Sequence, residues 1–203
     1  MSQFIGDVKS YSETYQVIFV LTMLDGKHGG KFLEIGAQDP IRISNTYLLE
    51  TEFGWNGISI DIDKSVEPLH KSHRNNTFIC GNALALNYAG ILGNTKQIDY
   101  LQIDIDPAIK SYNCLKILLM EDKYRFSVIT FEHDAYVGGD GPYVRDASRK
   151  LFERYGYMMV AGNITNGNPN TAYEDWFVDP LVVNTVKHIN RDANMSGKEF
   201  LSV

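Results

Sequence analysis

The feature that most constrains this chain is the stretch from Gly30 to Asp63, which contains one nucleotide-binding half-unit in order. An apolar run at residues 31–35 ends in Gly36 and Ala37, a helix-length segment follows, and a second apolar run at 57–60 ends in acidic residues. A buried strand that ends in a small-residue turn lets a ligand approach the backbone, and an acid after the next strand accepts hydrogen bonds from ribose hydroxyls. This pattern predicts a cofactor of the adenosine type.

The same alternation of apolar strands and helical segments continues along the chain. We predict strands at residues 32–35, 57–62, 77–80, 98–104, 126–132 and 157–161. We predict helices at 11–24, 46–53 and 66–74, around 114–121, and at 145–155. Strands separated by helices are joined by crossover connections, so this order predicts an α/β fold: a Rossmann-like, doubly wound, mostly parallel sheet with helices on both faces.

The length of the chain fixes the expected number of domains. A chain of 203 residues is long enough to bury one substantial core and too short for two well-built ones. We therefore expect a single domain with a helical N-terminal segment at 1–30 and a Rossmann-like core at 31–185. The remaining residues, 186–203, are expected to be a polar tail with a mobile end.

Charge and hydropathy argue against several classes of protein. The formal net charge of -6 opposes the broad basic surface that nonspecific phosphate binding requires, so we expect no nucleic-acid partner. No apolar run approaches the length of a membrane span, and the apolar residues 17–24 follow no basic lead, which disfavours a signal peptide. Cys80 and Cys114 fall in a predicted strand and a predicted helix, as buried free thiols do. We expect a cytoplasmic protein.

Five short motifs, taken in order between about Ser10 and Trp176, carry a resemblance to a known family. They are Phe32-Leu33-Glu34-Ile35-Gly36-Ala37, Ser44-Asn45-Thr46, Gly54-Trp55-Asn56-Gly57-Ile58, Asp99-Tyr100-Leu101-Gln102-Ile103-Asp104 and Ile129-Thr130-Phe131-Glu132-His133-Asp134. The chain resembles the FkbM-type methyltransferases, which belong to the class I S-adenosylmethionine-dependent methyltransferases. The resemblance implies a seven-stranded sheet whose last strand is antiparallel, S-adenosylmethionine as cofactor, and methyl transfer to a hydroxyl oxygen, often on a sugar or glycan.

Two departures from the family pattern fall beside the predicted site. Family members commonly have an Asp-Gly pair after the first turn, whereas this chain has Asp39-Pro40, so its loop must close on the methionine end of the cofactor without that glycine. They also commonly carry Val-Glu-Gly after the aspartate of the fourth strand, whereas Ile105-Asp106-Pro107 stands here. These departures bear on the substrate and the catalytic details rather than on the fold.

Four candidate cofactor residues follow from the first two strands. Gly36, followed by Ala37, would let the chain turn tightly beneath the cofactor. Glu34 would reach the amino group of the methionine moiety, directly or through water, because a carboxylate inside an apolar strand needs a partner; the alternative is that it caps a helix or pairs with Lys27. Asp61 would bind the ribose, unless it is only a solvated strand end.

The end of the third strand supplies two more candidates, and a shift in register would supply a substitute. Class I methyltransferases usually place an acid or amide after this strand beside the adenine amino group, which would be Asn82 here, with Ala83 contributing backbone. The alternative for Asn82 is a plain turn residue. Asp63 lies two residues after Asp61 and would replace it if the register slipped by two.

The predicted acceptor end of the site gathers three acids and an imidazole. Asp104 closes the fourth strand, and Glu132-His133-Asp134 closes the fifth, so all four would crowd the carboxyl edge where open α/β sheets bind ligands. Like charges at that distance repel one another unless something offsets them. We expect Asp104 and His133 to be the catalytic residues.

Three interpretations of this group remain open. A resemblance to metal-dependent sugar and catechol O-methyltransferases implies that Asp104, Glu132 and His133 bind magnesium or manganese, with Asp106 or Asp134 as alternates. Such a metal would lower the pKa of the acceptor hydroxyl. In the second interpretation His133 is a metal-free general base. In the third, His133 hydrogen-bonds a loop carbonyl, and the acids pair with Arg145 and Lys110.

Three further features have two interpretations each. His70 and His73 are better explained as exposed helix residues than as ligands. The glycine-rich loop at 136–143 is a mobile lid over the acceptor or a plain surface connection. Residues 174–177 form an aromatic wall for the acceptor or pack Trp176 and Phe177 into the core.

The expected partner is a small-molecule or glycan hydroxyl acceptor. Two other functions compete with methyl transfer. A nicotinamide-dependent oxidoreductase is disfavoured because only Gly36 stands where pyrophosphate binding expects further glycines. A non-catalytic cofactor-binding or glycan-binding module is the other.

Overall fold

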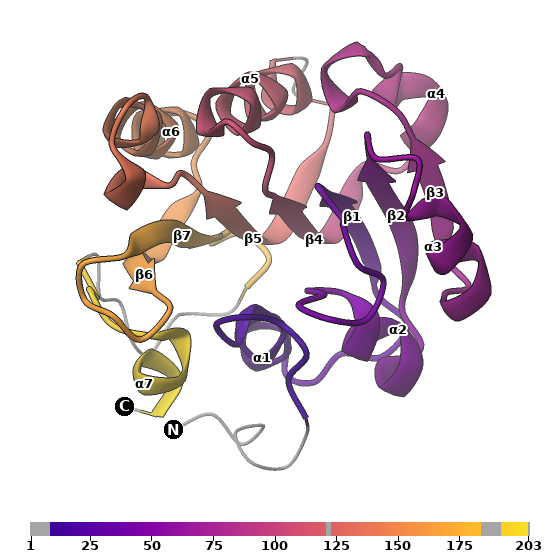
Figure 1. Ribbon diagram of the computed structural model, residues 1–203, viewed down its shortest axis with the longest axis horizontal. Helices are drawn as coiled ribbons and strands as arrows, with labels where there is room; N and C mark the ends of the chain where they lie inside the picture. The colour runs from indigo at the N-terminus through magenta and orange to yellow at the C-terminus, as the bar shows by residue number, and fades with distance from the viewer. Residues whose placement is uncertain (1–8, 121–122, 184–191, 203) are drawn as a thin grey trace.

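The computed structural model of the chain describes residues 9–120, 123–183 and 192–202. Its centre is a seven-stranded sheet with the spatial order β3-β2-β1-β4-β5-β7-β6 (Figure 1). The strands are β1 (Lys31–Ile35), β2 (Asn56–Asp61), β3 (Thr77–Cys80), β4 (Gln97–Ile103), β5 (Arg125–Glu132), β6 (Met158–Thr165) and β7 (Ala172–Val178). Neighbours from β3 to β5 are parallel, whereas β7 is antiparallel to both β5 and β6. The predicted mostly parallel sheet, including its antiparallel last strand, is confirmed.

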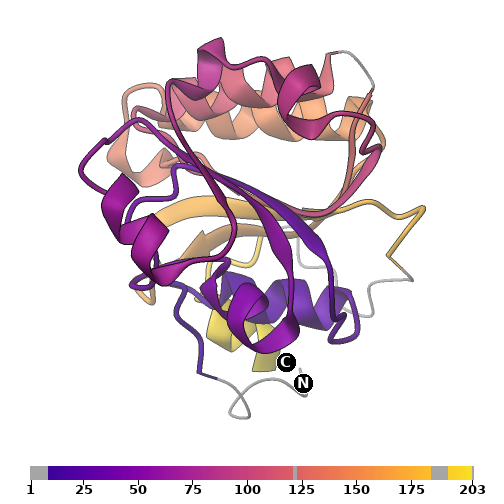
Figure 2. The same ribbon diagram turned by 90° about the vertical axis from the view of Figure 1, so that its right-hand side faces the viewer.

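Helices cover both faces of the sheet, as the doubly wound prediction requires (Figures 1 and 2). One face carries α1 (Gln16–Met23), α2 (Tyr47–Phe53) and α7 (Gly197–Ser202), and the other carries α4 (Tyr88–Leu92), α5 (Ala108–Leu119) and α6 (Gly141–Arg154). The helix α3 (Glu67–His73) lies beside β3, and η1 (Ala83–Ala85) and η2 (Ala135–Val137) are single 3₁₀ turns. Within the described residues, no helix combines the length and apolarity that crossing a membrane requires.

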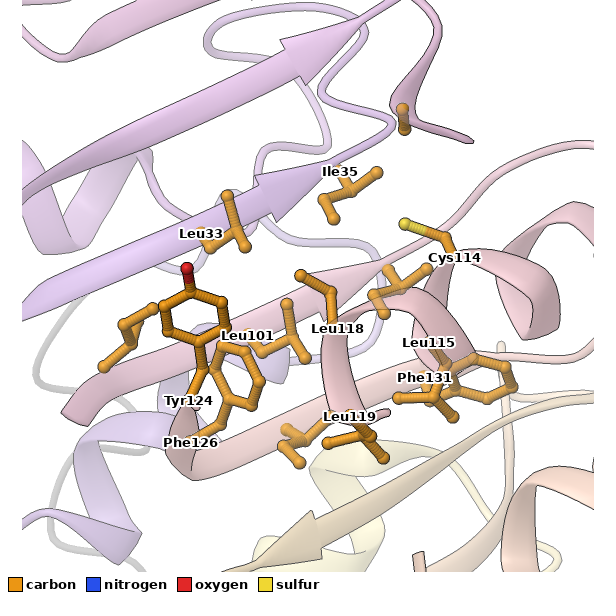
Figure 3. Packing of buried hydrophobic residues seen from close by; sticks show 14 of the residues in the cluster. Leu33, Ile35, Leu101, Cys114, Leu115, Leu118, Leu119, Tyr124, Phe126 and Phe131 are labelled. Atoms are coloured by element: carbon orange, nitrogen blue, oxygen red, sulfur yellow. The ribbon is translucent and has the colours of Figure 1, made fainter. Parts of the chain in front are cut away.

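The alternation of side chains along the strands builds a separate core on each face. Leu33 of β1 points toward α5, where it packs with Leu118 (Figure 3), whereas Phe32 belongs to the opposite core. That opposite core includes the buried residues 17–21 of α1, and Trp176 of β7 stacks on Phe19 with ring centroids 4.5 Å apart. Burying each large apolar side chain contributes about 1.5–3 kcal/mol, so packing rather than helix propensity holds these short helices in place.

Both Trp176 and Phe177 lie in the core, so the core-packing interpretation holds and the aromatic acceptor wall does not. The glycine at 197 explains how the C-terminal helix approaches Trp176. A Cβ at Gly197 would lie 2.5 Å from the Trp176 ring. Phe200 and Leu201 of α7 are buried, so the described end of the predicted polar tail packs against the domain.

Several element boundaries differ from the predictions for local reasons. The first helix begins at Gln16 rather than at residue 11, because Tyr15 has a left-handed backbone with φ 68°, which a helix cannot contain. Gly54 ends α2 with φ 65°, as predicted for a glycine stop. None of the strand and helix ranges predicted from the sequence covers β7, α4 or α7. Both cysteines are free; Cys114 is buried, whereas Cys80 is half-buried.

Candidate active site

Two adjoining cavities at the carboxyl edge of β1 to β4 bring all six predicted cofactor residues together. The larger has a volume of about 540 Å³ and the smaller about 30 Å³, and they share Gly36, Gln38 and Asp104. The six predicted residues divide between them: Gly36, Asp61, Asn82 and Ala83 line the larger, and Glu34, Gly36 and Ala37 line the smaller. Cofactor sites typically occupy about 300–1,000 Å³, so the larger cavity has the size of a nucleotide-type site.

Gly36 is required where the ends of β1 and β4 meet. Its φ is 85°, and a Cβ built on it would lie 1.6 Å from the backbone oxygen of Asp104. The Asp104 N–H in turn donates to the Ile35 oxygen at 2.9 Å. No other residue would fit here without moving a backbone, so the predicted tight turn follows from steric necessity.

Asp61 stands at the wall of the larger cavity with a fixed carboxylate. Its Oδ2 accepts a hydrogen bond from the Gln38 N–H, and its Oδ1 accepts one from the Asp63 N–H, both at 2.8 Å. A carboxylate has about four acceptor positions, so these two bonds leave capacity for a ligand. Asp63 also lines the cavity, but it is exposed and its Oδ1 accepts from the Ser65 N–H.

The smaller cavity presents oxygen acceptors. Glu34 is buried and accepts from Ser59 Oγ at 2.6 Å, and Lys27 pairs with Asp99 instead, so the predicted alternative of a Glu34–Lys27 pair is wrong. Asn45 lines the same cavity, and its buried Oδ1 has no hydrogen-bond partner in the described part of the chain. Asn45 was expected only as part of the Ser44-Asn45-Thr46 motif, because its orphaned oxygen cannot be predicted from local sequence.

Asn82 serves the turn and the cavity wall together. Its Oδ1 accepts from the Leu84 N–H at 3.0 Å and caps η1, as the turn interpretation requires. That bond uses one of the two lone pairs of the oxygen, and Nδ2 is the group that can donate to a ligand. The predicted contact of Asn82 with an adenine ring stays a prediction.

Three carboxyl groups form a hydrogen-bonded cluster beyond the shared wall. Glu132 is hydrogen-bonded to both Asp104 and Asp134, and such bonds between acids require protons. Burial, followed by the nearby Asp106 and Asp134 charges, raises the pKa of Asp104 to about 7. Burial and then the Asp104 charge raise the pKa of Glu132 well above its usual value. The predicted repulsion among these acids is therefore relieved by protonation.

His133, which we expected in this cluster, is placed elsewhere. The residue has no exposed surface, and its Nδ1 accepts from the Ala135 N–H at 3.1 Å, which leaves the ring proton on Nε2. Nε2 faces Asp175 Oδ1 at 3.4 Å, too long for a strong hydrogen bond. Burial opposes ionisation of Asp175, but two hydrogen bonds from Arg149, together with the nearby His133, lower its pKa to about 2. His133 is thus a buried structural residue rather than a base at the cleft.

The predicted metal ligands are consequently not brought together. Asp104 and Glu132 are adjacent but hydrogen-bonded to each other, and His133 faces away from them. Across residues 9–120, 123–183 and 192–202, no three His, Cys, Asp or Glu side chains are arranged to hold a metal ion. The third interpretation also needs correction: Arg145 pairs with Asp146, and Lys110 donates to the Asp106 backbone oxygen.

A third cavity, of about 250 Å³, adjoins the carboxyl cluster. Asp106 and Asp134 line it together with the glycine-rich residues 138–141. Tyr136 and Val137 beside it are exposed. The glycine-rich loop therefore borders a cavity, and its predicted role as a lid stays a prediction.

The structure corrects the interpretation of one histidine on α3. His73 is exposed as predicted, but His70 is 1 % exposed, and its Nε2 lies 3.0 Å from the Gln38 backbone oxygen. Arg74, four residues later, is also buried. Both side chains hydrogen-bond backbone oxygens of the loop between β1 and α2. The same loop contains Gln38, whose N–H donates to Asp61.

Comparison with known proteins identifies the fold. No protein-family model matches the chain, and no curated protein matches its sequence. A fibrillarin/Nop5p complex aligns with a TM-score of 0.55 and 15 % identity, covering 82 % of this chain and 79 % of that one. Aeropyrum pernix fibrillarin with natively bound S-adenosyl-L-methionine aligns at 0.53 and 12 %, covering 75 % and 67 %. The chain has a fold similar to that of fibrillarin. At these identities the likeness concerns the fold alone.

Proposed function

We propose that this chain is an S-adenosylmethionine-dependent methyltransferase that methylates a hydroxyl oxygen of a sugar, a glycan or another hydroxylated acceptor, as the FkbM-type resemblance implies. One observation carries the proposal. A nucleotide-sized cavity with Asp61 at its wall joins a small cavity lined by oxygen acceptors, and a third cavity, lined by Asp106 and Asp134, shares Asp106 with the larger one.

The residues present fit the cofactor at both of its ends. Asp61 would accept hydrogen bonds from the ribose hydroxyls, and Asn82 Nδ2 and the Ala83 backbone would contact the adenine. Glu34 and Asn45 offer oxygen atoms to the ammonium group of the methionine moiety, which is a hydrogen-bond donor only. The orphaned oxygen of Asn45 supports this assignment, because a buried acceptor without a partner destabilises a fold unless a ligand satisfies it.

The carboxyl cluster joins the cofactor side to the acceptor side. Asp104 lines both cofactor cavities, Asp134 lines the third cavity, and Glu132 is hydrogen-bonded to each of them. We assign the third cavity to the acceptor. An acceptor hydroxyl bound there would lie beside Asp134 and the cluster, and transfer in line with the methyl group would suit such an arrangement.

In this proposal Asp104 is the general base. The bound cofactor supplies an electrophilic methyl group on a sulfonium. As the acceptor oxygen bonded to the methyl carbon, the carbon–sulfur bond would break and release S-adenosylhomocysteine, and the O–H proton would move to the ionised Asp104 carboxylate. Glu132, protonated by the raised pKa that burial causes, donates a hydrogen bond that orients Asp104. No metal enters this proposal, because His133 faces away from Asp104 and Glu132.

Calorimetry and a transfer assay test the proposal in sequence. Titration with S-adenosylhomocysteine, S-adenosylmethionine and NAD should give binding of the first two only. Binding of NAD alone would favour an oxidoreductase, and the absence of binding to any of the three would overturn the proposal. Labelled S-adenosylmethionine is then incubated with panels of sugars, glycans and other hydroxylated compounds. Cofactor binding without transfer to any hydroxyl would favour the non-catalytic module.

A further inference from the structure

The loop between β1 and α2 contacts Asp61, at the wall of the larger cavity, through Gln38, whose backbone is strained. Gln38 donates its backbone N–H to Asp61, and it does so with φ 39°, in the left-handed region that residues other than glycine seldom adopt. Pro40 restricts the backbone further, and within the loop Asp39 Oδ1 accepts from the Ile41 and Arg42 N–H groups. The carbonyls of Gln38 and Pro40 accept hydrogen bonds from outside the loop.

Two buried side chains donate these bonds: His70 lies in α3, and Arg74 is the residue at its C-terminal cap. The Arg74 N–H donates to the His70 oxygen at 2.9 Å, so the two side chains lie one helical turn apart. The Gln38 carbonyl can only accept, so His70 Nε2 carries the proton of their 3.0 Å hydrogen bond. Arg74 Nη1 donates to the Pro40 oxygen at 3.0 Å. The two carbonyls that flank Asp39 are thus both bound by α3.

Arg74 extends the same contact to the next helix. Its Nε donates to Glu50 at 2.7 Å, and its Nη2 donates to Thr46 Oγ1 at 2.9 Å. The side chain of Arg74 has no exposed surface, and that of Glu50 is nearly buried. A guanidinium with its donors distributed in this way fixes the loop to α2 as well as to α3.

His70 occupies its position at a cost to the stability of the fold. Its Nδ1 is buried and has no hydrogen-bond partner among the described residues, and an unpaired buried acceptor is destabilising. Burial also lowers the pKa of His70, which keeps the ring neutral. The ring stacks on Phe78 with centroids 4.3 Å apart, a contact that phenylalanine would make without the orphaned nitrogen. What only the histidine adds is the Nε2–H bond to Gln38.

We propose that His70 and Arg74 are positioning residues that hold Gln38 and Pro40 in the conformation that binds the cofactor. This inference rests on the proposed function. The residues act through the loop: His70 fixes Gln38, and the Gln38 N–H orients the Asp61 carboxylate toward the cavity.

Paired substitutions at position 70 separate positioning from stability. His70→Phe keeps the ring that stacks on Phe78 and removes both ring nitrogens. We expect it to weaken S-adenosylhomocysteine binding about tenfold, the effect of one lost hydrogen bond, with an unchanged or higher thermal midpoint. His70→Gln places an amide nitrogen at the same number of bonds from Cα as Nε2. It should bind within about threefold of the wild type and melt at a lower temperature.

Calorimetry and thermal unfolding of both variants decide the matter, with His73→Phe on the exposed side of α3 as the matched control. In turnover, His70→Phe should raise KM for the cofactor and leave kcat nearly unchanged. The proposal is overturned if His70→Phe binds like the wild type, or if affinity simply follows stability across the variants. A wild-type chain that fails to bind S-adenosylhomocysteine overturns the proposed function as well, which distinguishes the two failures.

Discussion

At the carboxyl ends of β1 and β2, acids accept hydrogen bonds from backbone N–H groups, whereas at the ends of β4 and β5 acids hydrogen-bond to one another. On the first side, the Ile41 N–H lowers the pKa of Asp39, and the Ser65 N–H lowers that of Asp63. On the second side, burial raises the pKa of Asp104, Glu132 and Asp134. The two sides of one cleft therefore shift carboxyl pKa values in opposite directions.

In the proposed function the first side binds the cofactor and the second side reacts. Backbone donors favour the ionised form of an acid, which suits an acceptor for hydroxyl and ammonium groups. An acid with a pKa of about 7, as Asp104 has, takes up and returns a proton readily, which suits a base. Substitutions on the two sides should accordingly affect different kinetic constants.

The largest expected effect is that of Asp104→Asn. Removing a general base lowers kcat by about 10²–10⁴-fold, while the amide keeps the shape of the cleft. Cofactor affinity should change little, since Asp104 is not among the proposed cofactor ligands. Steady-state kinetics and calorimetry on the same preparation measure both. Asp146→Asn, at an exposed acid of α6 that lines none of the three cavities, is the control; equal losses in the two variants would remove the assignment of Asp104 as base.

Asp61→Ala should show the opposite pattern. It removes hydrogen bonds between a charged acceptor and two ribose hydroxyls, so S-adenosylhomocysteine should bind about a hundredfold more weakly. At saturating cofactor, kcat should remain close to that of the wild type. Asp63→Ala provides the comparison, because Asp63 lines the same cavity from an exposed position. A greater loss of affinity in Asp63→Ala would mean that Asp63 is the ribose ligand.

The acidic cluster also predicts how activity depends on pH. Because the pKa of Asp104 is raised to about 7, its carboxyl is protonated below that pH and cannot take the proton from the hydroxyl of the methyl acceptor. Activity should therefore rise about tenfold per pH unit below pH 7 and level off above it. The residual activity of Asp104→Asn should lack this rise. If the activity of the wild type stayed constant from pH 5.5 to 8, the raised pKa that distinguishes Asp104 from the acids of the cofactor side would have no effect on the reaction, which would contradict the prediction.

Local sequence was sufficient for the features that depend on near neighbours. β3 lies where it was predicted, and Gly36, Asp61 and Asn82 line the cavity as expected. These positions could be predicted because turns and strand ends depend on residues a few places apart in the sequence. The partners that decided the remaining features are distant in sequence. His70 of α3 was expected to be exposed, because its binding partner is a loop carbonyl 32 residues earlier and cannot be predicted from its neighbours in the sequence.

His133 illustrates the same limit at the acceptor side. Successive side chains near the end of a strand point to opposite faces, so Glu132 and His133 could not both enter the cluster. Its partner Asp175 lies on β7, which reads as polar in sequence because of Glu174 and Asp175. Those acids are buried only because Thr14 and Arg149 satisfy them. Neither antiparallel register nor such pairs can be read from the chain alone.

The smallest expected effect concerns stability and comes from Glu132→Gln. A buried acid whose folded pKa lies above its unfolded value must take up a proton on folding, so its contribution to stability falls as pH rises past the unfolded value. Glutamine supplies an amide donor to Asp104 without that proton. The variant should be more stable than the wild type by about 1 kcal/mol at pH 8, and this gain should shrink toward pH 5. Urea unfolding at the two pH values measures it. A gain of the same size at both would show that Glu132 is already ionised in the folded protein, and the acceptor side would then hold its charge as permanently as the cofactor side does.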